Sequence, residues 1–200
     1  MEEKSYHSLP LIGTYRENDA LTLYNEVKKH NDFVNFMRLY MHDEDYHVAR
    51  NALWSMTKAT DSELSQLLPI YNELIDLAMK ASNSSVCRLT LNIIERLKME
   101  EDDLRSDFLD FCLEKMTAID EPPGIQSLAM KLAYRMCKFY PELMNELIVT
   151  LKAMEMDFYT AAVKSVRNRI LKPNQAFPKG RMLDSINPLL FPYRIEQGIF

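Results

Sequence analysis

The chain has 200 residues, of which 47% are hydrophobic, so it can bury the core of one domain or one short repeat array. This apolar content excludes a chain that is disordered along its whole length. The sequence has only four glycines and lacks runs of Val, Ile and Thr with period two, which argues against a β fold. Residues 1–150 carry 16 basic and 25 acidic side chains, whereas residues 151–200 carry 8 and 4. An acidic body argues against a general nucleic-acid scaffold.

Residues 1–16 show no regular pattern, and residues 17–172 are predicted to form a helical repeat domain. Apolar side chains at helical spacing predict a first helix at about 19–30 and a second at 33–40. Asp43, Glu44 and Asp45 then open the next helix, because acidic residues cap free N–H groups and oppose the helix dipole.

From this point the sequence repeats itself. Four apolar segments begin at Val48, Val86, Ile125 and Phe158, which are 38, 39 and 33 residues apart. Four residues into each segment stands a small side chain that is predicted to be buried against neighbouring helices: Ala52, Thr90, Ala129 and Ala162. Second helices are predicted between these segments, over residues 64–78, over 104–116 and from Pro141 onward.

One of these segments resembles a known repeat family. The run Asp45-x-x-Val48-x-x-x-Ala52, followed by Ser55 and Met56, resembles the first helix of a HEAT repeat, and the spacing suits HEAT-type (armadillo-like) α-solenoids. The resemblance covers residues 17–170. It implies an all-α fold, a right-handed superhelix of about four two-helix units. A helical bundle without superhelical stacking is the alternative.

The chain departs from the HEAT pattern at the residue that directly follows the apolar start of each segment. The family usually has a basic residue there, whereas this chain has Ala49, Cys87, Gln126 and Tyr159. Arg50 and Arg88 stand one residue later. The resemblance therefore leaves open whether the Asp–Arg ladder between HEAT units is present.

Two charged sets are candidate binding sites. The second helices of a solenoid are expected to line its inner curve, where partners dock. They carry the residues that could bind a partner protein or a basic peptide: Glu73, Asp76, Asp107, Asp110, Glu142 and Glu146. Near the C-terminus, Arg167, Arg169 and Lys172 could bind phosphate. No basic residue of the earlier units is predicted to extend that second set.

No residues point to catalysis. The sequence lacks G-x-S-x-G, a phosphate-binding Gly-rich loop and H-E-x-x-H. The loop with His42 and His47 could hold a metal, but its acids are better explained as helix caps. Cys87, Cys112 and Cys137 lie in apolar patterns and indicate free buried thiols in a reducing compartment. We therefore expect no cofactor, no metal and a cytoplasmic location.

Residues 173–200 form a Pro-containing apolar tail, in which four prolines exclude a long helix. Leu189, Leu190, Phe191 and Tyr193 predict that the tail packs on the repeat domain or on a partner chain. The sequence as a whole predicts a non-enzymatic protein-interaction scaffold that does not enter a membrane. The alternative is a HEAT-like nucleic-acid-binding protein or a DNA-glycosylase-like enzyme that uses the C-terminal basic surface.

Overall fold

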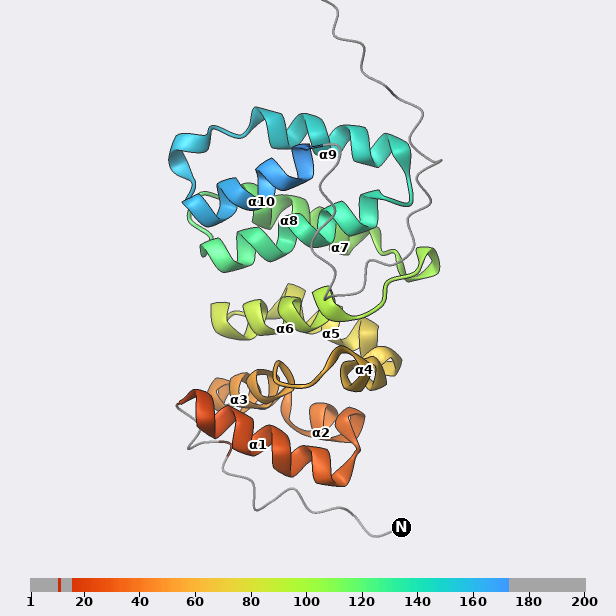
Figure 1. Ribbon diagram of the computed structural model, residues 1–200, viewed down its shortest axis with the longest axis vertical. Coiled ribbons are helices and arrows are strands. Elements are labelled where there is room, and N and C mark those ends of the chain that lie inside the picture. The colour runs from red at the N-terminus through yellow and green to blue at the C-terminus, as the bar shows by residue number, and fades with distance from the viewer. Residues whose placement is uncertain (1–10, 12–15, 173–200) are drawn as a thin grey trace, which may run out of the picture.

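A computed structural model of the chain describes Leu11 and residues 16–172, and it contains no β-strand within them. The helices stack along the long axis from α1 at one end to α9 and α10 at the other (Figure 1). Their bounds are α1 Glu17–His30, α2 Phe33–Tyr40, α3 Tyr46–Met56, α4 Asp61–Leu64, α5 Tyr71–Lys80, α6 Ser84–Arg96, α7 Ser106–Thr117, α8 Pro123–Cys137, α9 Pro141–Ala153 and α10 Ala161–Leu171. Short 3-10 turns are η1 Ser65–Ile70, η2 Glu101–Asp103 and η3 Met156–Phe158.

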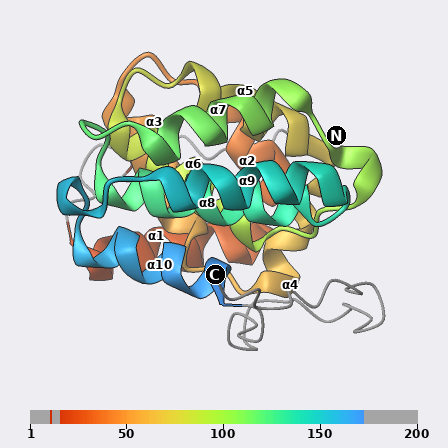
Figure 2. The same cartoon turned by 90° about the horizontal axis from the view of Figure 1, so that it is seen from above.

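The helices alternate between two roles. The first helices α1, α3, α6, α8 and α10 pack on one another in succession, and the second helices α2, α5, α7 and α9 pack against them. Seen from above, the pairs lie over one another rather than side by side (Figure 2). This arrangement confirms the predicted all-α superhelix of HEAT-like units, in place of the simple bundle.

The column of small residues is buried in three units of the four. Ala52, Thr90 and Ala129 are fully buried, and the Thr90 hydroxyl donates to the carbonyl of Val86 at 2.8 Å. The prediction was wrong for Ala162, which is exposed. α10 begins only at Ala161, so the buried positions fall one residue later than the alignment placed them, at Val163 rather than Ala162.

A single helix over residues 64–78 was also predicted wrongly. Pro69 lies inside the 3-10 turn η1, which separates α4 from α5. Proline has no N–H to donate and its ring blocks the preceding turn, so an α-helix cannot run through it without disruption. The apolar pattern continues across the break, because Leu67 and Ile70 of η1 are fully buried.

Both ends of the sequence lie largely outside the described residues. The structure does not describe residues 1–10, 12–15 and 173–200, so the predicted packing of the tail lies outside the described residues. Leu11 is described and buried, and its carbonyl accepts a hydrogen bond from the buried amide of Asn51 in α3. A point of the N-terminal segment is thereby attached to the first-helix row.

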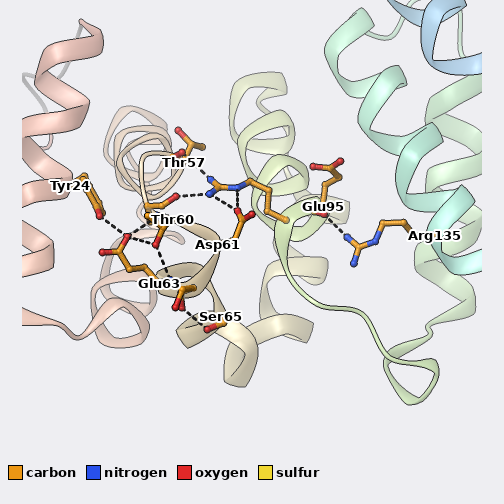
Figure 3. A network of polar contacts seen from close by, with 11 residues as sticks. Tyr24, Thr57, Thr60, Asp61, Glu63, Ser65, Glu95 and Arg135 are labelled. Carbon is orange, nitrogen blue, oxygen red and sulfur yellow. Dashed lines mark hydrogen bonds and ion pairs between the residues drawn. The ribbon is translucent and has the colours of Figure 1, made fainter. Parts of the chain in front are cut away.

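Arginine side chains join successive first helices. Arg135, near the end of α8, donates to the carbonyl of Glu95 where α6 ends (Figure 3). It also donates to the carbonyl of Leu97 at 2.7 Å. Arg96, the last residue of α6, donates to the carbonyls of Thr57 and Ala59 just past the end of α3. The last carbonyls of a helix have no partner within it, and cations there also oppose the negative end of its dipole.

Other helix ends are satisfied in the same manner. The Tyr159 hydroxyl donates to the carbonyl of Thr117, the last residue of α7, at 2.7 Å, and Gln126 donates to the next carbonyl, that of Ala118. Arg167 donates to the carbonyl of Leu151 near the end of α9 at 2.6 Å. The carbonyls at the ends of these helices therefore accept hydrogen bonds from side chains that lie later in the chain.

A second joint links α1 to α4. One carboxylate oxygen of Glu63 accepts from the hydroxyl of Tyr24 at 2.7 Å and from the N–H and hydroxyl of Thr60, both at 2.8 Å (Figure 3). Its other oxygen pairs with Lys28 at 2.8 Å. Burial alone would raise the pKa of Glu63, but these hydrogen bonds outweigh it and hold the pKa at about 2.

We expect Arg135→Ala to lower the free energy of unfolding by about 2–4 kcal/mol, because it leaves two helix-end carbonyls without a donor. Arg135→Lys should recover only part of this loss, since an ammonium lacks the planar fork of the guanidinium. Chemical denaturation checks both. The matched control is Lys152→Ala, at an exposed cation of α9, which should change stability by less than about 0.5 kcal/mol. Equal losses in Arg135→Ala and Lys152→Ala would contradict the capping role.

We expect Glu63 to contribute to the pH dependence of stability. Its pKa is lower in the folded state, so its contribution is complete above the unfolded value of about 4.5 and is lost as the pH falls toward 2. Between pH 6 and pH 3 the wild type should lose about 1–2 kcal/mol more than Glu63→Gln. Glu44→Gln, at an exposed loop acid, should keep the wild-type slope. Parallel slopes for wild type and Glu63→Gln would refute the role.

Candidate interaction surfaces

The two rows of helices differ in charge. The first helices α3, α6, α8 and α10 contain one acidic residue, Glu95, and eight basic residues: Arg50, Arg88, Arg96, Lys131, Arg135, Lys164, Arg167 and Arg169. The second helices α5, α7 and α9 contain three lysines and seven acids: Glu73, Asp76, Asp107, Asp110, Glu114, Glu142 and Glu146. From α3 onward the second-helix row is therefore acidic and the first-helix row is basic, whereas α1 adds Glu17, Asp19 and Glu26 to its row.

Glu73, one of the candidate acids, is held by the unit before it. Arg38 of α2 donates from Nε to both carboxylate oxygens at 3.2 Å and from Nη2 to one of them at 2.6 Å. These hydrogen bonds lower the pKa of Glu73. Arg38 neutralises this carboxylate, so Glu73 joins α2 to α5 rather than offering a free negative charge.

Asp76 and Asp107 share one arginine in the same way. Arg105, just before α7, donates to Asp76 of α5 at 2.7 Å and to Asp107 at 2.6 and 3.0 Å. The hydrogen bonds from Arg105 lower the pKa of Asp107, and both carboxylates raise the pKa of the guanidinium. Three of the six candidate acids are thus committed to joints between second helices.

The other three acids face solvent. Asp110 on α7 and Glu142 and Glu146 on α9 are exposed and form no ion pair with any described residue. Glu114 lies one turn beyond Asp110 and is exposed as well. Val149, one turn beyond Glu146, is 66% exposed. We call Asp110, Glu114, Glu142, Glu146 and Val149 the acidic surface.

The three candidate phosphate-binding residues lie on or beside α10 but differ in their surroundings. The Nε of Arg167 is engaged by the carbonyl of Leu151, and Arg169 is half-buried. Lys172 is exposed at the end of the helix. Arg50, Arg88 and Lys131 lie on earlier first helices of the same row, and no contact of theirs with these three residues is found among the described residues.

A repeated basic position was missed in the sequence. Ten residues after Val48, Val86 and Ile125 stand Lys58, Arg96 and Arg135, and the corrected register places Arg169 in the same column. The spacings of 38, 39 and 34 residues follow those of the units. The regularity of this column is the signal that could have revealed the joints.

The residues considered for metal binding and for thiol chemistry either cap a helix or are buried in the core. In the loop before α3, Asp45 accepts from the N–H of His47 at 2.9 Å, which is a helix cap, and also contacts the ring Nδ1 at 2.8 Å. Among the described residues no cluster of three or more His, Cys, Asp or Glu could hold a metal. Burial raises the pKa of Cys87 and Cys137 to about 11 and holds that of Cys112 well above its usual range, so all three thiols stay protonated at neutral pH.

Within residues 16–172 no helix has the length and apolar character required to cross a membrane. A family model described as a HEAT repeat domain matches residues 8–174 of the chain. No curated protein and no solved structure shows significant similarity to the chain. The matched range spans more than half of the chain and includes every described helix, from α1 to α10. The chain therefore belongs to the HEAT repeat domain family.

Proposed function

We propose that this HEAT repeat protein is a non-enzymatic interaction scaffold and that its acidic surface on α7 and α9 docks a basic helix or peptide of a partner protein. The observation that carries the proposal is a group of exposed carboxylates, Asp110, Glu142 and Glu146, that pair with no cation in residues 16–172. Carboxylates used only to join the units would be paired, as Glu73 is with Arg38.

The geometry of α9 suits a helical partner. Glu142, Glu146 and Val149 are spaced by four and three residues, so they lie along one stripe of the helix. Asp110 and Glu114 are spaced by four residues, so they lie along one stripe of the preceding second helix, α7. A partner helix with Lys or Arg at its flanks and one apolar side chain facing Val149 would match this surface in charge and hydrophobicity.

The proposal includes a cytoplasmic location. Cys87, Cys112 and Cys137 are free and buried, which suits a reducing compartment where disulfides do not form. Binding of nucleic acid through Arg167, Arg169 and Lys172 stays the alternative. Arg167 serves as a helix cap and offers only part of its guanidinium to a phosphate.

We expect the double charge reversal Glu142→Lys/Glu146→Lys to weaken binding of a lysine-rich amphipathic helical peptide about tenfold, because two exposed ion pairs are replaced by repulsion. Fluorescence anisotropy of the labelled peptide measures this effect. Wild-type binding should also weaken between ~0.1 and ~1 M salt, as the Debye length shortens from about 10 to about 3 Å.

The matched control is Glu44→Lys/Asp102→Lys, which changes the net charge equally at two exposed acids outside the second helices. This control should bind the peptide within about twofold of wild type. Equal weakening in both double variants would show that net charge alone attracts the peptide, and the assignment of a docking surface to α7 and α9 would be wrong.

A further inference from the structure

The basic first-helix row has an exposed stripe of its own. In the segment that starts at Val48, Arg50 and Trp54 stand two and six residues after the start. In the segment that starts at Val86, the residues two, six and nine positions after the start are Arg88, Asn92 and Glu95. The next unit continues the pattern with Lys131, Tyr134 and, after one more turn, Lys138. These positions share one face of a helix. All are half-buried or exposed, so a basic stripe with two aromatic residues crosses successive units.

Contacts between helices show that this stripe is continuous from α6 to α8. Arg88 reaches from α6 to the first turn of α8, where a Cβ added to Gly124 would stand 2.9 Å from the arginine Cδ. Lys131 of α8 forms an ion pair with Glu95 of α6 at 3.6 Å, so its charge is partly balanced within the stripe. The side chains therefore occupy the space between two neighbouring first helices rather than separate surfaces.

Cations and aromatic rings lie together at both ends of the stripe. The Nζ of Lys58 lies 5.8 Å from the ring centre of Trp54, and that of Lys138 lies 4.7 Å from the ring centre of Tyr134. Burial and the nearby charge of Arg135 lower the pKa of Lys138 to about 8. An anion beside Lys138 would stabilise its charged form, so the charge balance at this end favours an acidic ligand.

The spacing of the cations separates two kinds of acidic ligand. Arg50 and Arg88 occupy equivalent positions on α3 and α6, and neighbouring helices lie about 8–10 Å apart, so we expect these two cations at about that interval. An extended peptide rises about 3.3 Å per residue, so acidic residues three apart recur at about 10 Å. Phosphates of single-stranded nucleic acid follow one another more closely than acidic residues three apart in an extended peptide.

We propose that the stripe formed by Arg50, Trp54, Arg88, Lys131, Tyr134 and Lys138 is a second docking site, which binds an extended acidic segment of a partner protein with Asp or Glu at about every third residue. The site is separate from the acidic surface on α7 and α9. A scaffold with two surfaces of opposite charge would hold two different partners side by side.

Trp54 is the one tryptophan of the chain, so its fluorescence reports directly on this stripe. The probe is a 15-residue peptide without aromatic residues that carries Glu at every third position, and the control peptide carries Gln at those positions. We expect the Glu peptide to change Trp54 fluorescence with a salt-dependent affinity and the Gln peptide to have no effect. No fluorescence change with the Glu peptide, measured with micromolar protein at low salt, would overturn the proposal.

The variant Arg88→Glu should weaken binding of the Glu peptide by about threefold to tenfold, because one exposed attraction becomes a repulsion. Lys152→Glu, with the same charge change at an exposed lysine of α9, should bind the peptide as wild type does. Arg88→Gln serves as a second, milder variant, and thermal melts establish that all three fold. Equal weakening by Arg88→Glu and Lys152→Glu would overturn the assignment to the first helices.

A single-stranded oligothymidylate in the same titration tests the other polyanion. We expect it to bind more weakly than the Glu peptide at equal salt. Tighter binding of the oligonucleotide would replace the acidic peptide by nucleic acid as the ligand of this stripe. The experiment does not involve Asp110, Glu142 or Glu146, so its failure would leave the proposed function on the acidic surface intact.

Discussion

A stack of helices buries the ends of its own helices, and the carbonyl groups there need donors. The last carbonyls of α3 and α6 lie under the next unit, where Arg96 and Arg135 donate to them. A buried carbonyl without a donor costs about 1–3 kcal/mol, which is a large part of the stability of a small domain. Apolar packing brings neighbouring units together, and these side chains determine which helix end each unit must meet.

The same requirement helps to explain the division of charge. Arg96 and Arg135, each ten residues into its segment, satisfy the preceding helix end, which accounts for two of the basic residues on the first-helix row. The second helices join through carboxylates and arginines instead, at Glu73 with Arg38 and at Asp76 with Arg105. Charges beyond these joints, such as Glu146 on one row and Arg88 on the other, remain available to partners.

Periodicity in the sequence predicted the fold well, because each unit repeats one apolar face. The burial of Ala52, Thr90 and Ala129 followed from that spacing, whereas Ala162 failed because α10 starts one residue later. The joints were missed although Arg96 and Arg135 recur with the units, because they bond to backbone carbonyls, so no acidic partner residue marks the other side of each joint. The acids of the second helices were identified correctly as residues, but only coordinates could separate paired Asp107 from unpaired Glu146.

Hydrogen–deuterium exchange of the Arg135→Ala variant tests most directly whether helix-end capping joins the units. We expect faster exchange at the C-terminal half of α6 and in α8, the two helices that Arg135 connects, while α1 to α3 keep wild-type rates. Exchange unchanged in α6 and α8, or accelerated equally in every helix, would contradict a joint at this position.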